Sequence, residues 1–173
     1  SCGIAPRYSD IDAGAMAAAA IDEAVRNAVC VGVDVNKIAG LDNFCWPDPI
    51  QSDKTPDGKF KLAQLVRANR ELERICRAYR LPCVSGKDSM KNDYGKGEDK
   101  ISIPPTLLFS LFGDHPDVRN TATSDFKNAG DKIYLVGESH EELGASEVSF
   151  MLKENGVAAG IGGNVPALSN PEK

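Results

Sequence analysis

One stretch of helix length, residues 59–79, constrains the fold of this chain more than any other. Apolar residues recur along it at the spacing of an α-helix: Leu62, Leu65, Val66, Leu72, Ile75, Cys76 and Tyr79. A helix with one apolar side must pack against a core, where each fully buried side chain contributes roughly 1.5–3 kcal/mol. The helical pattern stops at residues 80–82, where Pro82 cannot continue a helix. We therefore expect a long amphipathic helix followed directly by another element.

The segment that follows, 81–90, carries the densest set of candidate site residues. Its residues 83–84 form a short apolar run, which predicts a buried strand that ends in Gly86. Glycine lets a backbone turn or approach a ligand closely. Lys87 offers a charge for phosphate, and Ser89 both donates and accepts hydrogen bonds. The spacing is not that of a P-loop. A phosphate or metal loop is one interpretation, and an ordinary turn with solvated charges is the other.

An alanine-rich stretch predicts a second helix over about residues 13–29, capped by Asp10 or Asp12. Its small side chains leave room for another backbone or a ligand to come close. Glu23 and Asn27 lie one turn apart on the same face. A carboxylate and an amide carbonyl in this arrangement suit Mg²⁺, which prefers oxygen ligands. The pair is a candidate metal site, and the alternative is a partly exposed pair without a partner.

Shorter runs predict the other elements of the first part of the chain. Residues 38–41 read as a buried strand that ends at Asp42, and 106–112 as a longer apolar strand. Between them, the polar stretch 91–100 predicts a hairpin or flap. Trp46 follows the first strand, and we expect it in the core rather than in a lid, since tryptophan is usually mostly buried.

A change of composition near Val118 predicts a domain boundary, with one domain over 1–118 and a second over 119–173. In the second part, residues 133–136 predict a strand, and Ser146 is expected to cap a short helix. One strand and one helix cannot bury a core by themselves. We therefore expect the second domain to be incomplete.

The composition excludes several kinds of function. A net charge of -5 argues against a general nucleic-acid surface, and no run of 18 or more apolar residues predicts a membrane span. The five cysteines form no CxxC pair, and those in apolar surroundings (Cys30, Cys76 and Cys83) are expected to act as small hydrophobic residues in a reducing compartment, the cytoplasm. The two histidines lack metal-ligand spacing. We identify no catalytic general base.

Four motifs occur here in the order that they have in one enzyme family. They are Asp22-Glu23-Ala24-Val25-Arg26-Asn27, Leu41-Asp42-Asn43-Phe44-Cys45-Trp46-Pro47, Ser85-Gly86-Lys87-Asp88-Ser89-Met90-Lys91-Asn92 and Glu142-Leu143-Gly144-Ala145-Ser146-Glu147. Through them the chain resembles the phosphoribosylformylglycinamidine synthases, ligases of purine biosynthesis, over about residues 3–166. Each motif alone is weak, but four in order are specific.

The resemblance implies an α/β (α+β sandwich) fold. It places residues 1–118 in the N-terminal, aminoimidazole ribonucleotide synthetase-like domain of the second half of such an enzyme, as a partial domain. Residues 119–173 then begin the C-terminal domain of that half. The implied reaction joins ammonia from glutamine to formylglycinamide ribonucleotide at the expense of ATP, and the implied cofactors are ATP or ADP and Mg²⁺.

The same resemblance assigns roles to residues. Glu23 and Asn27 fall on Mg²⁺ ligands of a nucleotide site that is auxiliary in the long form of the enzyme. Asp42 and Gly86 fall on ATP-contacting positions of the short form.

Two further positions complete these assignments. Ser89 falls on a position that contacts the ribonucleotide substrate. Lys87 departs from the short form, which has a metal-binding Asn there. Because a charged lysine cannot ligate Mg²⁺, we expect Lys87 to contact phosphate instead.

The implied partners are the first half of the enzyme and its glutaminase domain or subunit, and we expect the chain to be inactive alone. A strand as long and apolar as 106–112 would expose an edge without its partner half, so we also expect a self-pairing dimer. Alternatives are another enzyme of the same fold, such as a selenophosphate synthetase or thiamine-phosphate kinase, and a non-catalytic module that holds a nucleotide or forms a dimer interface.

Overall fold

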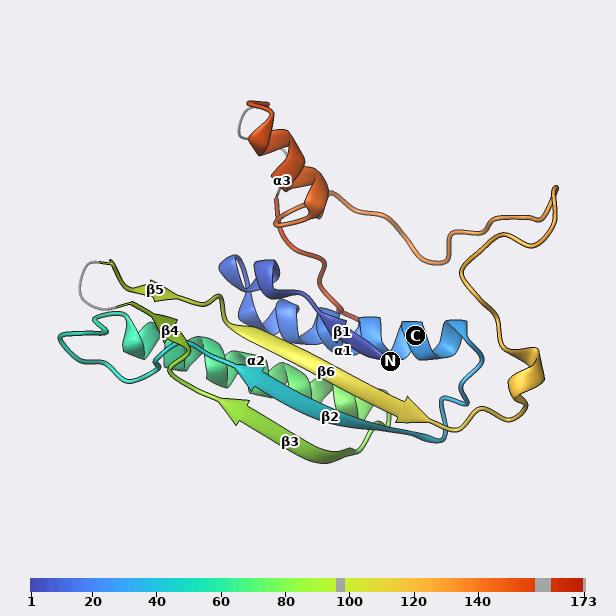
Figure 1. Ribbon diagram of the computed structural model, residues 1–173, viewed down its shortest axis with the longest axis horizontal. Helices are drawn as coiled ribbons and strands as arrows, with labels where there is room; N and C mark the ends of the chain where they lie inside the picture. Colours follow the sequence, from blue (N-terminus) through green and yellow to red (C-terminus); the bar gives the residue numbers. More distant parts are fainter. Residues whose placement is uncertain (96–98, 158–162, 173) are drawn as a thin grey trace.

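The computed structural model of the protein describes residues 1–95, 99–157 and 163–172, so residues 96–98 of the expected hairpin lie outside the described part. Two long helices, α1 (Ala13–Cys30) and α2 (Gly58–Ala78), lie side by side on one face of a four-stranded sheet (Figure 1). Its strands, in spatial order, are β1 (Cys2–Ile4), β6 (Thr106–Gly113), β2 (Ile38–Cys45) and β3 (Cys83–Ser89). The expected α/β fold class is confirmed.

Smaller elements surround this unit. A 3-10 turn, η1 (Pro6–Asp10), leads from β1 into α1, and β4 (Asp93–Tyr94) pairs with β5 (Ile101–Ser102) as a separate ribbon. Beyond β6 come a second 3-10 turn, η3 (Val118–Asn120), and the short helix α3 (Glu147–Glu154).

The small residues of α1 let β1 lie directly on the helix. Asp12 begins the helix, as expected for one of the two candidate caps, because its Oδ1 accepts from the backbone amides of Gly14 and Ala15 at 2.7 and 3.0 Å. Further along, a Cβ added to Gly3 of β1 would lie 2.0 Å from the carbonyl oxygen of Ala20. The backbones of β1 and α1 are therefore in direct contact.

The apolar stripe of α2 is only partly buried. Ile75 and Cys76 are buried, but Leu62 and Val66 are exposed at 46% and 44%, so their predicted place in the core is wrong. Lys61 is buried instead. Its ammonium group contacts Ser102 Oγ at 2.9 Å and Asp57 Oδ2 at 3.1 Å, so the charge is paired while the aliphatic stem packs inside.

The strands β2 and β3 are longer than the sequence predicts, and the edges of the sheet are not where we expected one. β2 continues to Cys45, so Asp42 lies within a strand and not at its end. β6 lies between β1 and β2, so the expected free edge at 106–112 is wrong, and the edges of the sheet are β1 and β3. Pairing with two neighbours satisfies the backbone of β6, which explains why an apolar strand can lie there without exposing an edge.

One face of the sheet meets the helices and the other does not. Phe44, Trp46 and Phe109 point toward the helices and are buried, and Trp46 Nε1 donates to the carbonyl of Lys61 at 2.9 Å, which confirms Trp46 as a core residue. On the opposite face, Ile4 and Phe112 are exposed at 46% and 58%. This open face contains apolar side chains that could bury further surface.

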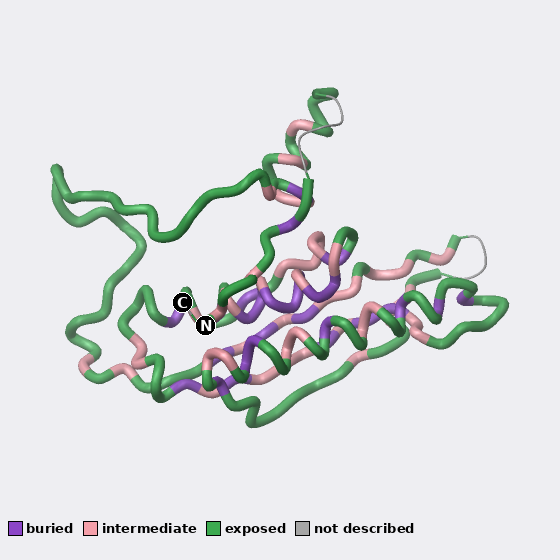
Figure 2. Tube along the Cα trace, turned by 180° about the vertical axis from the view of Figure 1, so that it is seen from behind, coloured by how far each residue is buried: buried purple, intermediate pink, exposed green. Residues whose placement is uncertain are grey.

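The region after β6 extends away from the helix–sheet unit and is mostly exposed (Figures 1 and 2). Residues 133–136 form no strand, and their side chains are 78–85% exposed, so that prediction is wrong. A strand needs a paired neighbour for its backbone, and none of the described residues offers one there. Ser146 does cap α3, since its Oγ accepts from Ser149 N at 3.1 Å.

The end of the described chain returns to the helices. Val165 is buried, and the Arg74 guanidinium donates to the carbonyl of Leu168 at 2.8 Å. The division near Val118 stays a prediction. Within the described residues, no helix is long and apolar enough to cross a membrane.

Candidate functional site

The candidate residues form two clusters at opposite edges of the sheet. The first is the β1 edge, with Glu23 and Asn27. Ser1 and Leu111 exchange both backbone hydrogen bonds, at 2.8 and 2.9 Å, so the alternation of an antiparallel pair turns the polar groups of Cys2 and Ile4 away from β6.

Side chains of α1 satisfy these outward groups. The amide of Ile4 donates to Glu23 Oε2 at 2.8 Å, and Asn27 Nδ2 donates to the carbonyl of Cys2 at 3.1 Å. Glu23 and Asn27 thus replace a neighbouring strand and close the β1 edge. Each keeps one oxygen, Glu23 Oε1 and Asn27 Oδ1, for which the described structure gives no hydrogen bond. The alternative interpretation, in which Glu23 and Asn27 are a partly exposed pair without a partner, is therefore wrong, because both residues bond to β1.

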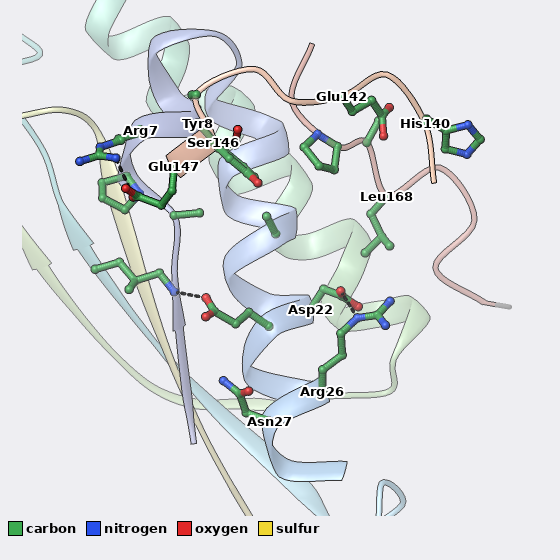
Figure 3. Close-up of a pocket in the computed structure, with 18 of the residues that line it drawn as sticks. Arg7, Tyr8, Asp22, Arg26, Asn27, His140, Glu142, Ser146, Glu147 and Leu168 are labelled. Atoms are coloured by element: carbon green, nitrogen blue, oxygen red, sulfur yellow. Dashed lines mark hydrogen bonds and ion pairs between the residues drawn. The ribbon is translucent and has the colours of Figure 1, made fainter. Parts of the chain in front are cut away.

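A cavity of about 1080 Å³ lies beside this edge, between α1, η1 and the region before and after α3 (Figure 3). Five carboxylate residues line it: Asp22, Glu23, Glu138, Glu142 and Glu147. The guanidinium groups in its wall already have partners, since Arg7 contacts Glu147 at 2.6 Å and Arg26 contacts Asp22 at 2.5 Å. The excess of negative charge favours a cation.

Asp22 is a residue of this cavity to which the sequence reasoning gave no role. It accepts from the Tyr79 hydroxyl at 2.6 Å as well as from Arg26. Burial raises the pKa of Tyr79, and the hydrogen bond to Asp22 raises it further, so the phenol stays protonated. The spacing of Asp22 and Arg26, four residues apart on a helix, was the available signal. Tyr79 directly follows α2, and the sequence gave no signal that it would contact Asp22.

The residues at the β1 edge fit Mg²⁺ in donor type. Glu23 Oε1 and Asn27 Oδ1 are hard oxygen donors, and both residues line the cavity. Among the described residues, no group of three or more His, Cys, Asp or Glu side chains could hold a metal. The two oxygens are therefore a partial ligand set, of the kind that waters and phosphate oxygens complete.

The second cluster is the β3 edge, with Asp42, Gly86, Lys87 and Ser89. β3 continues to Ser89, parallel to β2, so the predicted end of this strand at Gly86, with a phosphate or metal loop there, is wrong. Gly86 pairs with Asp42, and an added Cβ would lie 2.9 and 3.0 Å from the two carboxylate oxygens of Asp42. The glycine is thus needed for close approach and not for a turn, since its φ is not positive.

The strand alternation divides this cluster between the two faces of β3. Asp42 and Gly86 face the helices. Burial raises the pKa of the Asp42 carboxyl, its backbone hydrogen bond opposes this, and Asp88 adds to it. Lys87 Nζ donates to Ser89 Oγ on the open face, and Lys87 is exposed.

The far end of β3 is held in place. The carbonyl of Ser89 accepts from Trp46 N at 2.8 Å and from Asn92 Nδ2 at 3.0 Å. A cation and a hydroxyl on a fixed, exposed strand can bind an anion such as phosphate. The β1 and β3 edges lie on opposite sides of the sheet, so the predicted site residues fall into two separate clusters.

Comparisons with known proteins agree with this fold. No family model matches the chain. It is 37% identical over 169 residues to the phosphoribosylformylglycinamidine synthase subunit PurL of Anaeromyxobacter sp., covering 97% of this chain and 20% of that protein. It is 33% identical over 160 residues to PurL of Deinococcus radiodurans, covering 90% of this chain and 20% of that protein.

A solved structure of T. maritima PurL complexed with AMPPCP matches with a TM-score of 0.56 and 22% identity, over 70% of this chain and 18% of that one. This likeness confirms the synthetase-like fold. The resemblance inferred from the four motifs is also confirmed. The chain spans about a fifth of the length of the relatives that it matches. This chain is therefore a homologue of one segment of the phosphoribosylformylglycinamidine synthase subunit PurL.

Proposed function

We propose that this chain contributes nucleotide- and substrate-binding residues to a phosphoribosylformylglycinamidine synthase. The enzyme would be an ATP-dependent ligase that converts formylglycinamide ribonucleotide and glutamine-derived ammonia to formylglycinamidine ribonucleotide. The similarity to PurL over 97% of the chain carries this proposal. That relative is one subunit of a synthase, which supports further subunits as partners of this chain. A glutaminase is the partner that the reaction requires, because the ammonia comes from glutamine. The free cysteines support the cytoplasm as the compartment.

The β1 edge is our candidate for a Mg²⁺–nucleotide site. Glu23 Oε1 and Asn27 Oδ1 would hold the ion, whose charge neutralises nucleotide phosphates. The cavity is acidic, so a nucleotide without metal should be repelled from it. A PurL solved with AMPPCP supports a nucleotide as the ligand.

The β3 edge is our candidate for contact with ATP and substrate. Lys87 would bind phosphate, Asp42 and Gly86 would contact the nucleotide, and Ser89 would contact formylglycinamide ribonucleotide. None of these side chains is placed as a general base, because Asp42 lies against the helices and Lys87 is a charged donor. The described chain therefore supports binding roles, and we expect it to be inactive alone.

A binding experiment separates this function from a non-catalytic dimerisation module. We expect calorimetric titration of the purified chain to detect Mg-ADP and to detect no ADP in the presence of EDTA. A module that only forms an interface would bind neither. Binding of ADP with and without metal at equal affinity would contradict the acidic Mg²⁺ site.

Kinetics of a complete PurL that carries this segment would test the β3 edge. Lys87→Ala should lose a charge-assisted hydrogen bond of roughly 1.5–3 kcal/mol, which is about tenfold to hundredfold in rate. Gly86→Ala should impair ATP use, since the methyl group would displace Asp42. Ser89→Ala should raise the KM for the ribonucleotide. Lys59→Ala, an exposed lysine on α2, is the control. Unchanged kinetics in all three variants would reject these assignments.

We also propose that the isolated chain forms a dimer through the open face of the sheet. Ile4 and Phe112 are exposed there, and the β3 edge is unpaired within the described residues. A second copy would bury both features. Light scattering should give a dimer mass, and Phe112→Ser should give a monomer. A monomer of the unmodified chain at high concentration would contradict this proposal.

A further inference from the structure

Two cysteines that the proposed function does not use lie together where α2 meets β3. Cys76 is in the last turn of α2, and Cys83 is the first residue of β3. Their sulfur atoms are 3.8 Å apart. Cys76 is buried and Cys83 is exposed, so only the second is open to solvent. The expectation that these cysteines act as small hydrophobic residues fits the buried Cys76 but not Cys83 or Cys30, which are exposed.

The connection between the two cysteines is hydrogen-bonded and holds them in place. Leu81 N donates to the carbonyl of Cys76 at 2.8 Å, and Arg80 N donates to the carbonyl of Arg77 at 3.2 Å. Arg80 has a φ of 52° in this tight reversal. A disulfide has a sulfur–sulfur distance of about 2.05 Å, so bond formation requires only a small approach of two side chains that already face each other.

The charged residues around the two cysteines indicate which kind of oxidant would bind there. An open groove of about 710 Å³ is lined by both cysteines and by three charged residues, Glu73, Arg77 and Arg80. Arg77 contacts Glu73 at 3.2 Å, whereas the structure shows no partner for the Arg80 side chain among the described residues. A groove with an unpaired guanidinium group beside a thiol suits a small disulfide that carries carboxylates.

We propose that Cys83 and Cys76 form a thiol–disulfide modification site for small anionic disulfides. The Cys83 thiolate attacks one sulfur of the disulfide RSSR and releases RS⁻, which leaves a mixed disulfide on Cys83. The Cys76 thiolate then attacks Cys83 Sγ and releases the second RS⁻. Two protein thiols are oxidised to one disulfide, RSSR is reduced to two RSH, and the two thiol protons end on those products.

The reaction should be slow at neutral pH. Burial raises the pKa of the Cys83 thiol, and a nearby Asp42 adds to this, while the contact with Cys76 opposes it. Burial and the neighbouring Cys83 raise the pKa of Cys76 as well. The thiolate is the nucleophile, and a raised pKa lowers its fraction. We therefore expect little oxidation of these thiols by a dilute disulfide and measurable oxidation only in a sustained excess of it.

Peptide mapping after oxidation with glutathione disulfide tests the proposal. Trypsin cleaves after Arg74, Arg77, Arg80 and Lys87, so the two cysteines fall on separate peptides, Ile75–Arg77 and Leu81–Lys87. We expect these peptides to be joined by a disulfide in the oxidised full chain and separated again by dithiothreitol. Linkage of either cysteine to Cys2, Cys30 or Cys45 instead, or a stable glutathione adduct on Cys83 without linkage, would overturn it.

Variants separate the two steps. Cys76→Ser should stop at the mixed disulfide and keep glutathione on Cys83, whereas Cys83→Ser should lose modification of Cys76. Arg80→Gln should slow the oxidation several-fold with glutathione disulfide but not with uncharged 2-hydroxyethyl disulfide. Cys30→Ser is the matched control and should leave the linkage unchanged. Equal rates for Arg80→Gln and the unmodified chain with both oxidants would contradict the selection of an anionic disulfide.

Discussion

The two edges of the sheet differ in how their backbone groups are satisfied. At the β1 edge, Glu23 and Asn27 from α1 bond to the outward amide of Ile4 and the outward carbonyl of Cys2. At the β3 edge, no other strand pairs with the outer side within the described sheet, and most residues of β3 are exposed. Both edges contain residues that the family resemblance assigns to ligands. The comparison teaches that side chains of a helix can close the edge of a sheet, and in our proposal only the β1 edge is both closed in this way and a ligand site.

Gly3→Ala is the change that should affect the β1 edge most. The added methyl group would lie 2.0 Å from Ala20 O and 2.8 Å from Ala24 N, and helix backbone cannot move aside as a flexible side chain can. We expect a loss of about 3 kcal/mol in the free energy of unfolding, at the upper end for overpacking. Urea unfolding measures it, with Cys2→Ala, an exposed neighbour, as the control. Equal urea midpoints for Gly3→Ala and Cys2→Ala would show that β1 does not pack directly against α1.

Glu23→Ala should open the β1 edge at a smaller cost. The amide of Ile4 would lose its acceptor, which we expect to lower the free energy of unfolding by about 1 kcal/mol because the site is exposed to water. Glu23→Gln keeps a carbonyl oxygen in the same place and should unfold like the unmodified chain. Amide hydrogen exchange at Ile4 gives the local measure and should accelerate in the alanine variant alone. Equal acceleration in both variants would mean that charge, and not the hydrogen bond, closes the edge.

Asp42, beside the β3 edge, should have the smallest effect, and that effect depends on pH. Because burial raises its pKa, the stability that Asp42 provides is fully present below the pKa of an unfolded aspartate, about 3.9, and is lost as the pH rises through the folded pKa. Asp42→Asn should therefore be slightly more stable than the unmodified chain at pH 7 and equal to it at pH 3.

Urea midpoints at the two pH values measure this difference, with Asp10→Asn, a change at an exposed aspartate, as the control. A less stable Asp42→Asn variant at pH 7 would mean that the ionised carboxylate has a favourable partner in the folded chain.

The sequence predicted local structure well where local signals decide it. The run of alanines after Asp12 gave α1 with its cap, and Ser146 gave the cap of α3. The ends of the strands were wrong, because pairing decides them. β2 and β3 extend to Cys45 and Ser89 along each other, whereas 133–136, with higher β-propensity, forms no strand in the absence of a described neighbour.

The candidate site residues were also predicted well where a local signal decides their place, and poorly where strand pairing decides it. The helical spacing of Glu23 and Asn27 correctly put both on one face, and the structure shows that both line a cavity. Their bonds to β1 could not be predicted, since β1 is three residues long and its pairing with β6 joins positions more than a hundred residues apart. The segment around residues 86–89 was expected to be a ligand-binding loop at the end of a strand. It is instead part of the strand β3, which turns Lys87 and Gly86 to opposite faces.

Titration of Mg-ADP into Glu23→Gln tests most directly whether the β1 edge is both a structural cap and a metal site. The variant keeps the acceptor for Ile4 N and loses the charge for Mg²⁺. We expect unchanged urea unfolding and at least about tenfold weaker Mg-dependent binding, which is about 1.4 kcal/mol. Asn27→Asp should do the reverse, with a retained oxygen ligand and a weakened edge, and the control Lys59→Ala, an exposed lysine on α2, should bind like the unmodified chain. Glu23→Gln that binds Mg-ADP as tightly as the unmodified chain would contradict the account.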